Sequence, residues 1–187
     1  MINMIDVLSQ HPVIAAVRNL EAAQKAAQSN AAAVFILGGS LMTLPDIVHE
    51  IHAAGKYAFV HIDLADGLGR DEAAVEWCAA SLKADGLIST RPQLLRKASE
   101  MGMLTIQRLF LMDSSSFEHG KRLLRNTPPD MAEVLPGIAP KAVRQLCEAL
   151  DKPVIAGGMI TEKSEIIAAL DAGALAVSVS DESLWNL

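Results

Sequence analysis

The most informative segment of the chain is Val154-Ile-Ala-Gly-Gly-Met-Ile160, where an apolar, β-branched run ends in two glycines. A second such run, Ala176-Val-Ser-Val-Ser-Asp181, follows about twenty residues later, and a helical pattern separates the two. This order is typical of two consecutive βα units. Glycines at a strand end let backbone N–H groups approach a ligand, and the following helix N-terminus suits a phosphate. The pattern predicts a phosphate site at Gly157 and Gly158; the alternative is that both glycines only turn the chain.

The same alternation of apolar runs and helical patterns fills all 187 residues. Strands that alternate with single helices indicate a parallel sheet, and eight such units favour closure into a barrel. We therefore expect one α/β domain over residues 1–187, a compact (β/α)8 TIM-like barrel with an eighth helix shortened to Asp181–Asn186. An open, doubly wound sheet is the competitor, but no GxGxxG motif follows the first run.

The boundaries of these elements follow from the patterns. The expected strands are Val13–Val17, Ala33–Leu37, Ala58–Asp63, Gly86–Thr90, Leu104–Met112, Ala132–Leu135, Val154–Ala156 and Ala176–Val179. The expected helices are Leu20–Ser29, Leu44–Ala54, Asp71–Lys83, Pro92–Met101, Ser116–Arg125, Pro140–Leu150 and Ser164–Ala172.

The two ends of the chain are expected to close the barrel. Met1–Leu8 carries apolar residues at helical spacing and is expected to cover the bottom, while Trp185 is expected to pack on the barrel wall. A shortened last helix would expose apolar wall, which leaves the formation of a homodimer open.

Composition describes a well-packed globular protein, with 51% hydrophobic and 20% charged residues. No apolar run approaches the ~20 residues that cross a membrane, and the N-terminal residues show no signal-peptide pattern. Cys78 and Cys147 lie in helical patterns without CxxC or Cys/His spacing, which indicates reduced thiols rather than a disulfide or a metal site. We expect a cytoplasmic protein that does not contact membranes.

Charge is distributed unevenly along the chain. The formal net charge is −6, yet residues 91–144 hold nine Lys/Arg and five Asp/Glu, a local balance of +4 against −10 elsewhere. Such asymmetry indicates a site for a polyanion; the alternative is a set of scattered, solvated helix faces.

Polar residues at the carboxyl ends of the strands are the candidate site, because function in this architecture lies there. His61 and Asp63 share one strand face by the two-residue period, and Glu133 ends a later strand. Together they suit acid–base chemistry, a divalent metal or the hydroxyls of a polyol; alternatively they only bond one another. None of the eight lysines lies in an expected strand, and no nucleophile elbow or diagnostic metal motif occurs, so no catalytic residue and no metal site is assigned.

The chain resembles the glycerol-3-phosphate-responsive antiterminators from about His11 to Trp185. Six motifs in sequence order carry the resemblance: His61–Leu68, Ala84–Arg91, Thr105–Ser114, Glu133–Lys141, Ile155–Gly158 and Ser183–Trp185. The resemblance implies a TIM-barrel-like regulator that binds glycerol 3-phosphate as its effector, needs no cofactor, and acts on leader mRNA of glycerol-utilisation genes to prevent premature termination. We expect the phosphate at Gly157, Gly158, Ser178 and Ser180, and the glycerol hydroxyls at His61, Asp63 and Glu133.

An RNA surface is expected where the basic residues gather. Consecutive helices of a barrel are neighbours on its outer wall, so eight cations can form one strip. They are Arg91, Arg96, Lys97, Lys121, Arg122, Arg125, Lys141 and Arg144, with Phe117 the nearest candidate for stacking. The alternative function is a phosphate-binding barrel enzyme acting on a small polyol or sugar phosphate, with Glu133 or His61 as base and Asp63 or Asp66 assisting a metal.

Overall fold

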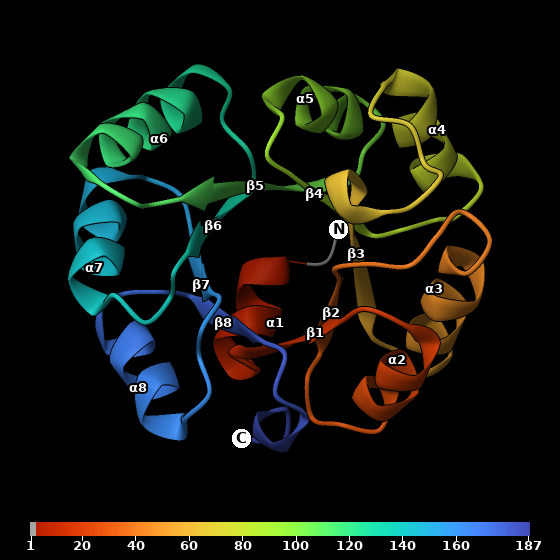
Figure 1. Ribbon diagram of the computed structural model, residues 1–187, viewed down its shortest axis with the longest axis horizontal. Coiled ribbons are helices and arrows are strands. Elements are labelled where there is room, and N and C mark those ends of the chain that lie inside the picture. The colour runs from red at the N-terminus through yellow and green to blue at the C-terminus, as the bar shows by residue number, and fades with distance from the viewer. Residues whose placement is uncertain (1–2) are drawn as a thin grey trace.

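A closed barrel of eight parallel strands, paired in sequence order from β1 to β8 and back to β1, forms the centre of the molecule (Figure 1). The computed structural model describes residues 3–187. The strands are β1 (Val13–Val17), β2 (Ala33–Ile36), β3 (Tyr57–His61), β4 (Gly86–Ser89), β5 (Leu104–Phe110), β6 (Met131–Leu135), β7 (Val154–Gly157) and β8 (Ala176–Val179). The (β/α)8 barrel expected from the sequence is confirmed.

Within residues 3–187, seven helices ring the outside of the barrel, one after each of the strands β1 to β7 (Figure 1). They are α2 (Leu20–Ala27), α3 (Leu44–Ala53), α4 (Glu72–Ala80), α5 (Pro92–Glu100), α6 (Ser114–Asn126), α7 (Pro140–Ala149) and α8 (Lys163–Asp171), with short 3-10 turns η1 (Ile62–Leu64) and η2 (Glu182–Leu184). Helix α1 (Met4–Gln10) precedes β1 and lies across one end of the barrel. No helix among the described residues is long and apolar enough to cross a membrane.

Two of the boundary differences have local causes. Helix α6 begins two residues earlier than expected because Asp113 caps it, accepting a hydrogen bond from the Ser116 N–H at 2.7 Å. Strand β3 stops at His61, and the chain then tightens into η1, so the expectation that Asp63 belongs to the strand is wrong.

One end of the barrel is filled by apolar side chains and covered by α1. Met4 and Leu8 of α1 are buried against the interior cluster that includes Phe35 and Phe59, whose rings meet edge to face at 5.6 Å. A Cβ at Gly86 would overlap the Phe59 ring, which explains the glycine at the start of β4. The expected cover is confirmed for Met4 to Leu8, while Met1 and Ile2 lie outside the described residues.

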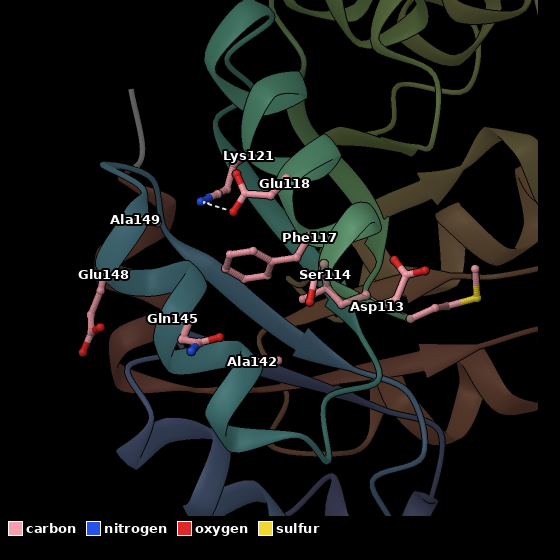
Figure 2. Close-up of a pocket in the computed structure, with 11 residues that line it drawn as sticks. Asp113, Ser114, Phe117, Glu118, Lys121, Ala142, Gln145, Glu148 and Ala149 are labelled. Atoms are coloured by element: carbon pink, nitrogen blue, oxygen red, sulfur yellow. Dashed lines mark ion pairs between the residues drawn. The ribbon is translucent and has the colours of Figure 1, made fainter.

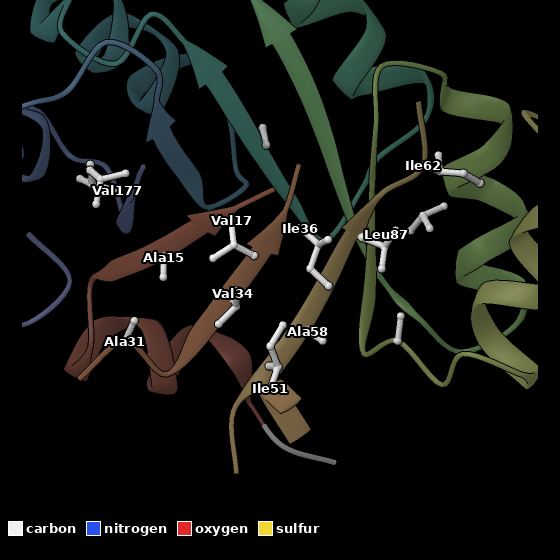
Figure 3. Packing of buried hydrophobic residues seen from close by; sticks show 14 of the residues in the cluster. Ala15, Val17, Ala31, Val34, Ile36, Ile51, Ala58, Ile62, Leu87 and Val177 are labelled. Atoms are coloured by element: carbon white, nitrogen blue, oxygen red, sulfur yellow. The ribbon is translucent and has the colours of Figure 1, made fainter. Parts of the chain in front are cut away.

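The larger core lies between the strands and the outer helices. Val17, Val34, Ile36, Ala58 and Leu87 point outward from the sheet into this layer (Figure 3). Such strands are buried on both faces, as in other parallel sheets with helical cover.

The shortened eighth helix is η2, and it leaves no strand uncovered. Trp185 is buried and its indole N–H donates to the Val179 carbonyl at 2.9 Å. All residues of β8 and β1 are buried, so the exposed wall expected beside the last helix does not occur there. The packing expected for Trp185 is confirmed.

The other end of the barrel interior is polar. Four buried polar residues each follow an interior apolar residue of the same strand by two positions. They are His61 after Phe59, Arg108 after Ile106, Glu133 after Met131 and Ser178 after Ala176. Side chains alternate between faces along a strand, so these four residues are placed in the inward-facing layer nearest the mouth. The fold thus separates an apolar floor from a polar mouth.

Candidate functional site

A cavity of about 310 Å³ opens at the mouth of the barrel, at the carboxyl ends of β1, β5, β6, β7 and β8. Its polar lining includes Arg18, Arg108, Glu133, Ser178, Ser180 and Asp181. This volume lies within the usual range for small-molecule sites. Of the residues predicted to bind glycerol hydroxyls, Glu133 lines the cavity, while His61 and Asp63 do not.

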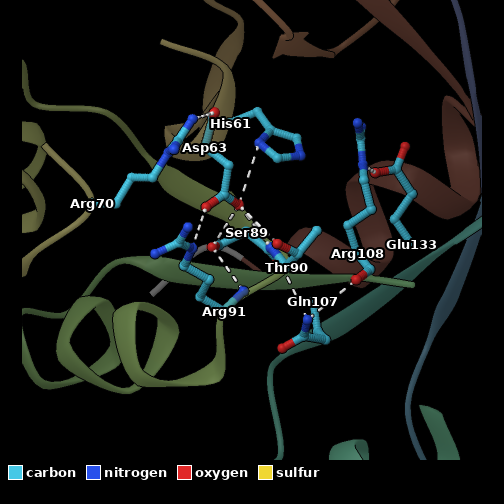
Figure 4. Close-up of polar contacts among 9 residues, drawn as sticks. All are labelled: His61, Asp63, Arg70, Ser89, Thr90, Arg91, Gln107, Arg108 and Glu133. Atoms are coloured by element: carbon cyan, nitrogen blue, oxygen red, sulfur yellow. Dashed lines mark hydrogen bonds and ion pairs between the residues drawn. The ribbon is translucent and has the colours of Figure 1, made fainter. Parts of the chain in front are cut away.

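A buried ion pair forms one wall of this cavity. Arg108 on β5 and Glu133 on β6 are register partners, and Arg108 Nε lies 2.6 Å from Glu133 Oε2 (Figure 4). Ser178 Oγ on β8 donates to the other carboxylate oxygen, Oε1, at 2.7 Å. The Glu133 carboxylate therefore joins three strands, and the alternative that polar residues in the mouth bond one another holds for this residue.

Gly157 makes room for this network. A Cβ at Gly157 would lie 2.6 Å from Glu133 Oε1 and would also overlap Ser178 Oγ. The next residue, Gly158, has φ +79°, a backbone conformation that side-chain-bearing residues rarely adopt. Gly157 is therefore required by the space that the Glu133 carboxylate occupies, whereas the positive φ of Gly158 agrees with the alternative that this glycine turns the chain.

Backbone donors are available beside the glycines. The N–H groups of Gly158, Met159 and Ser180 donate no backbone or side-chain hydrogen bond within residues 3–187. Gly158, Met159 and Ser180 all line the mouth cavity. The loops after β7 and β8 thus offer unpaired donors to an anion, as the sequence predicts.

A second polar cluster surrounds Asp63, beside the first (Figure 4). Asp63 Oδ2 accepts hydrogen bonds from the Ser89 hydroxyl and the Thr90 N–H, both at 2.8 Å, and Asp63 Oδ1 lies 3.3 Å from Arg91 Nε. Asp63 is engaged by these partners and does not line the cavity that Glu133 lines, so the structure does not gather the three predicted hydroxyl-binding residues around one cavity. Asp63 lies on η1 rather than on a strand face shared with His61.

His61 lies next to this cluster and is 2% exposed. Its Nδ1 lies 3.8 Å from Asp63 Oδ2 and has no hydrogen-bond partner. Burial lowers the pKa of His61 to about 4, and the positive charge of Arg108 acts in the same direction. His61 is therefore uncharged at neutral pH.

Comparison with known proteins identifies the family. Residues 13–185 match the family model of the glycerol-3-phosphate responsive antiterminators. The chain belongs to this family. The resemblance found in the six sequence motifs is confirmed over nearly the whole chain.

Individual relatives of this antiterminator-family chain agree with the match. It is 36% identical over 184 residues to the uncharacterized protein YgcP of Escherichia coli (strain K12), covering 98% of this chain and 96% of that protein. The crystal structure of the glycerol uptake operon antiterminator regulatory protein from Listeria monocytogenes str. 4b F2365 is 35% identical, with a TM-score of 0.88 over 92% of this chain and 94% of that one. A glycerol uptake operon antiterminator-related protein from Thermotoga maritima MSB8 is 29% identical, with a TM-score of 0.82 over 92% and 96%.

Four of the eight basic residues predicted to bind RNA make polar contacts in this antiterminator-family barrel. Arg91 pairs with Asp63; Lys97 lies 2.8 Å from a Glu76 oxygen, Lys121 lies 2.6 Å from a Glu118 oxygen, and Arg144 donates to the Asp171 carbonyl at 3.4 Å. The other four are exposed and have no ion pair within residues 3–187: Arg96, Arg122, Arg125 and Lys141. These four lie on α5, α6 and α7, which follow one another around the barrel (Figure 1).

A groove of about 620 Å³ lies between α6 and α7 and shares no lining residue with the mouth cavity (Figure 2). Phe117 and Lys121 of α6 face Gln145 of α7 across it, and the Lys121 ammonium lies 5.0 Å from the centre of the Phe117 ring. The groove is larger than the mouth cavity, but its lining residues are all at least partly exposed. The buried, charged residues therefore make the mouth the candidate small-molecule site.

Clusters of metal ligands do not occur in the described part of the chain: no three His, Cys, Asp or Glu side chains are grouped to hold an ion. Cys78 is buried and free, and burial raises the pKa of its thiol to about 12, as expected of an unreactive, reduced cysteine. Asp66, considered for a metal in the enzyme alternative, is exposed and pairs with Ser40 through the backbone.

Proposed function

We propose that this protein binds glycerol 3-phosphate at the mouth of the barrel and then promotes antitermination on leader mRNA of glycerol-utilisation genes. The observation that carries the proposal is the mouth cavity, where unpaired backbone donors and two arginines surround a space of about 310 Å³. Membership of the antiterminator family supports glycerol 3-phosphate as the effector.

The loops after β7 and β8 bind the phosphate in this proposal. The N–H groups of Gly158 and Ser180 have no protein acceptor among the described residues, and Gly158, Ser178 and Ser180 all line the cavity. Phosphates commonly bind at this position in barrels of this type. Gly157 takes part by leaving space rather than by donating.

The glycerol hydroxyls lie toward Glu133 in this proposal. Each Glu133 oxygen accepts one hydrogen bond within the protein and keeps a further lone pair for a hydroxyl. His61 and Asp63 do not line the cavity, and in this proposal they act through the packing of the mouth.

RNA binds in this proposal along the strip of cations on α5, α6 and α7. The support is the four exposed cations without an ion pair, which are free to neutralise RNA phosphates. Phe117 is half-buried at the edge of the groove, so backbone charge contributes more than base stacking.

The proposal includes no catalytic step. Both oxygens of Glu133 are engaged by Arg108 and Ser178, and Asp63 is engaged by Ser89, Thr90 and Arg91. A carboxylate held in this way is suited to organising a binding site.

Two measurements test the proposal. In calorimetry, glycerol 3-phosphate is expected to bind at least about 100-fold more tightly than glycerol, because charge-assisted hydrogen bonds to the phosphate are lost with glycerol. RNA carrying the leader of neighbouring glycerol genes is expected to bind more tightly when glycerol 3-phosphate is present. The proposal is contradicted if glycerol and glycerol 3-phosphate bind with equal affinity, or if the RNA affinity is the same with and without glycerol 3-phosphate. If the protein turns over polyol phosphates and the Glu133→Gln variant does not, the enzyme alternative is favoured.

A further inference from the structure

Arg108 is a buried cation with unused hydrogen-bond donors. Its side chain is 6% exposed, and its one hydrogen bond within residues 3–187 runs from Nε to Glu133. The two terminal NH2 groups make no hydrogen bond to the described protein, and the residue lines the mouth cavity. Each terminal NH2 nitrogen keeps some accessible surface, so both can donate to an acceptor from outside the protein.

The ion pair fixes where those donors point. Glu133 holds the Nε edge of the guanidinium, and the outer end continues beyond the carboxylate (Figure 4). Ser178 on β8 holds the same carboxylate from the other side. This chain of contacts leads from β5 across β6 to β8, where the unpaired N–H of Ser180 also lines the cavity.

The acidic residue at the rim does not compete for the guanidinium. Asp181 lines the cavity, but its Oδ1 accepts from the Ser183 N–H at 2.9 Å and from the Ser183 hydroxyl at 2.7 Å. Arg18 adds a second positive charge on the lining. The free donors in the cavity are thus positively charged or amide groups, and this combination suits a phosphate oxygen.

We infer that the terminal NH2 groups of Arg108 bind the phosphate of the ligand directly, and that Glu133 is a positioning residue that orients this guanidinium. The inference rests on the proposed function because it concerns the same cavity, and it names the ligand class as a phosphate monoester of a small polyol. A planar guanidinium with two parallel donors matches two phosphate oxygens, which a lysine ammonium does not.

The test compares inorganic phosphate, glycerol 3-phosphate and glycerol by calorimetry on the full chain. Arg108→Gln is expected to weaken binding of both phosphate compounds at least about 30-fold, and Arg108→Lys is expected to fall between this variant and the wild type. Lys83→Gln is the matched control: it also removes one positive charge, from an exposed residue before β4 at the end of the barrel opposite the mouth, and is expected to change affinity less than about twofold.

A second variant addresses folding. Arg108→Gln leaves Glu133 buried without its partner, which is strongly destabilising, whereas replacing both by methionine removes the pair together and is often tolerated. The folded Arg108→Met, Glu133→Met protein is expected to bind neither phosphate compound. Glu133→Gln is expected to weaken binding of inorganic phosphate, a ligand without glycerol hydroxyls, which separates positioning of Arg108 from contact with a hydroxyl.

The outcomes are distinguishable. If the wild type binds glycerol 3-phosphate and the double-methionine variant binds it equally well, the proposed function stands and the role of Arg108 is overturned. If the wild type binds inorganic phosphate through Arg108 but does not prefer glycerol 3-phosphate, the role of Arg108 stands and the proposed effector falls. A wild type that binds neither phosphate compound overturns both.

Discussion

Gly157 and Glu133 fit together so closely that a single methyl group would separate them, since a Cβ on Gly157 would lie 2.6 Å from Glu133 Oε1. The two residues lie on neighbouring strands, and Glu133 pairs in register with Ile155, two residues before the glycine. The absence of a side chain at Gly157 thus leaves the space that the buried Glu133 carboxylate occupies.

Gly157→Ala tests this fit. The added methyl group is expected to displace the Glu133 side chain and lower the free energy of unfolding by about 1–3 kcal/mol, the usual cost of overpacking a buried site. Affinity for glycerol 3-phosphate is expected to fall with it because Arg108 loses its orientation. Denaturant unfolding and calorimetry on the same variant measure both effects; an unchanged unfolding midpoint shows that the site relaxes freely.

The buried His61 gives stability a dependence on pH. Its pKa of about 4 in the folded protein is below its ordinary value of about 6.5, so the unfolded chain binds more protons between these values. The contribution is complete above about pH 6.5 and is lost as pH falls toward 4, to a total of about 3 kcal/mol. Chemical denaturation of the wild type and of His61→Gln between pH 7 and pH 4 checks this, and curves of equal slope would refute it.

The cationic strip is tested by Lys121→Ala, Arg122→Ala and Arg125→Ala in one protein. RNA affinity is expected to fall and the slope of log affinity against log salt to flatten by about two, because about three fewer phosphates are neutralised. Binding of glycerol 3-phosphate is expected to stay nearly unchanged. A triple alanine variant at Lys25, Lys152 and Lys163 removes the same charge elsewhere and serves as the control. If the strip variant binds RNA at low salt as tightly as the wild type, the strip is a solvated face and does not bind RNA.

Trp185 is expected to hold the end of the chain on the barrel. It is 2% exposed and donates to the Val179 carbonyl, so Trp185→Ala is expected to cost about 3–5 kcal/mol in the free energy of unfolding. Trp185→Phe keeps most of the apolar contact and loses the hydrogen bond, with an expected cost of about 1 kcal/mol for the bond. Equal losses in the two variants would assign the whole effect to the hydrogen bond.

The barrel could be predicted because its signal is repeated along the chain. Each strand is a short apolar run, each helix has its own apolar face, and β1 and β8 lie at the expected residues. The error at Asp63 arose because the two-residue period was extended past His61, and a 3-10 turn leaves little trace in the pattern of apolar residues.

The site was harder to predict because it depends on pairing between strands. Glu133, Ser178 and the glycines were found as polar or small residues at strand ends, but Arg108 was missed. The two-residue period from Ile106 places Arg108 on the interior face, so its direction was present in the sequence. The pairing of Arg108 with Glu133 cannot be predicted in the same way, since the register of β5 against β6 does not follow from the sequence of either strand alone.

The barrel is open at one end only, because α1 and the aromatic residues of the floor close the end opposite the mouth. A small molecule that enters the mouth cavity must leave by the same opening, and its contacts are confined to strand ends and the loops that follow them. We expect a bound molecule to influence the rest of the protein through these loops and the outer helices that follow them, because the opposite end of the barrel is closed.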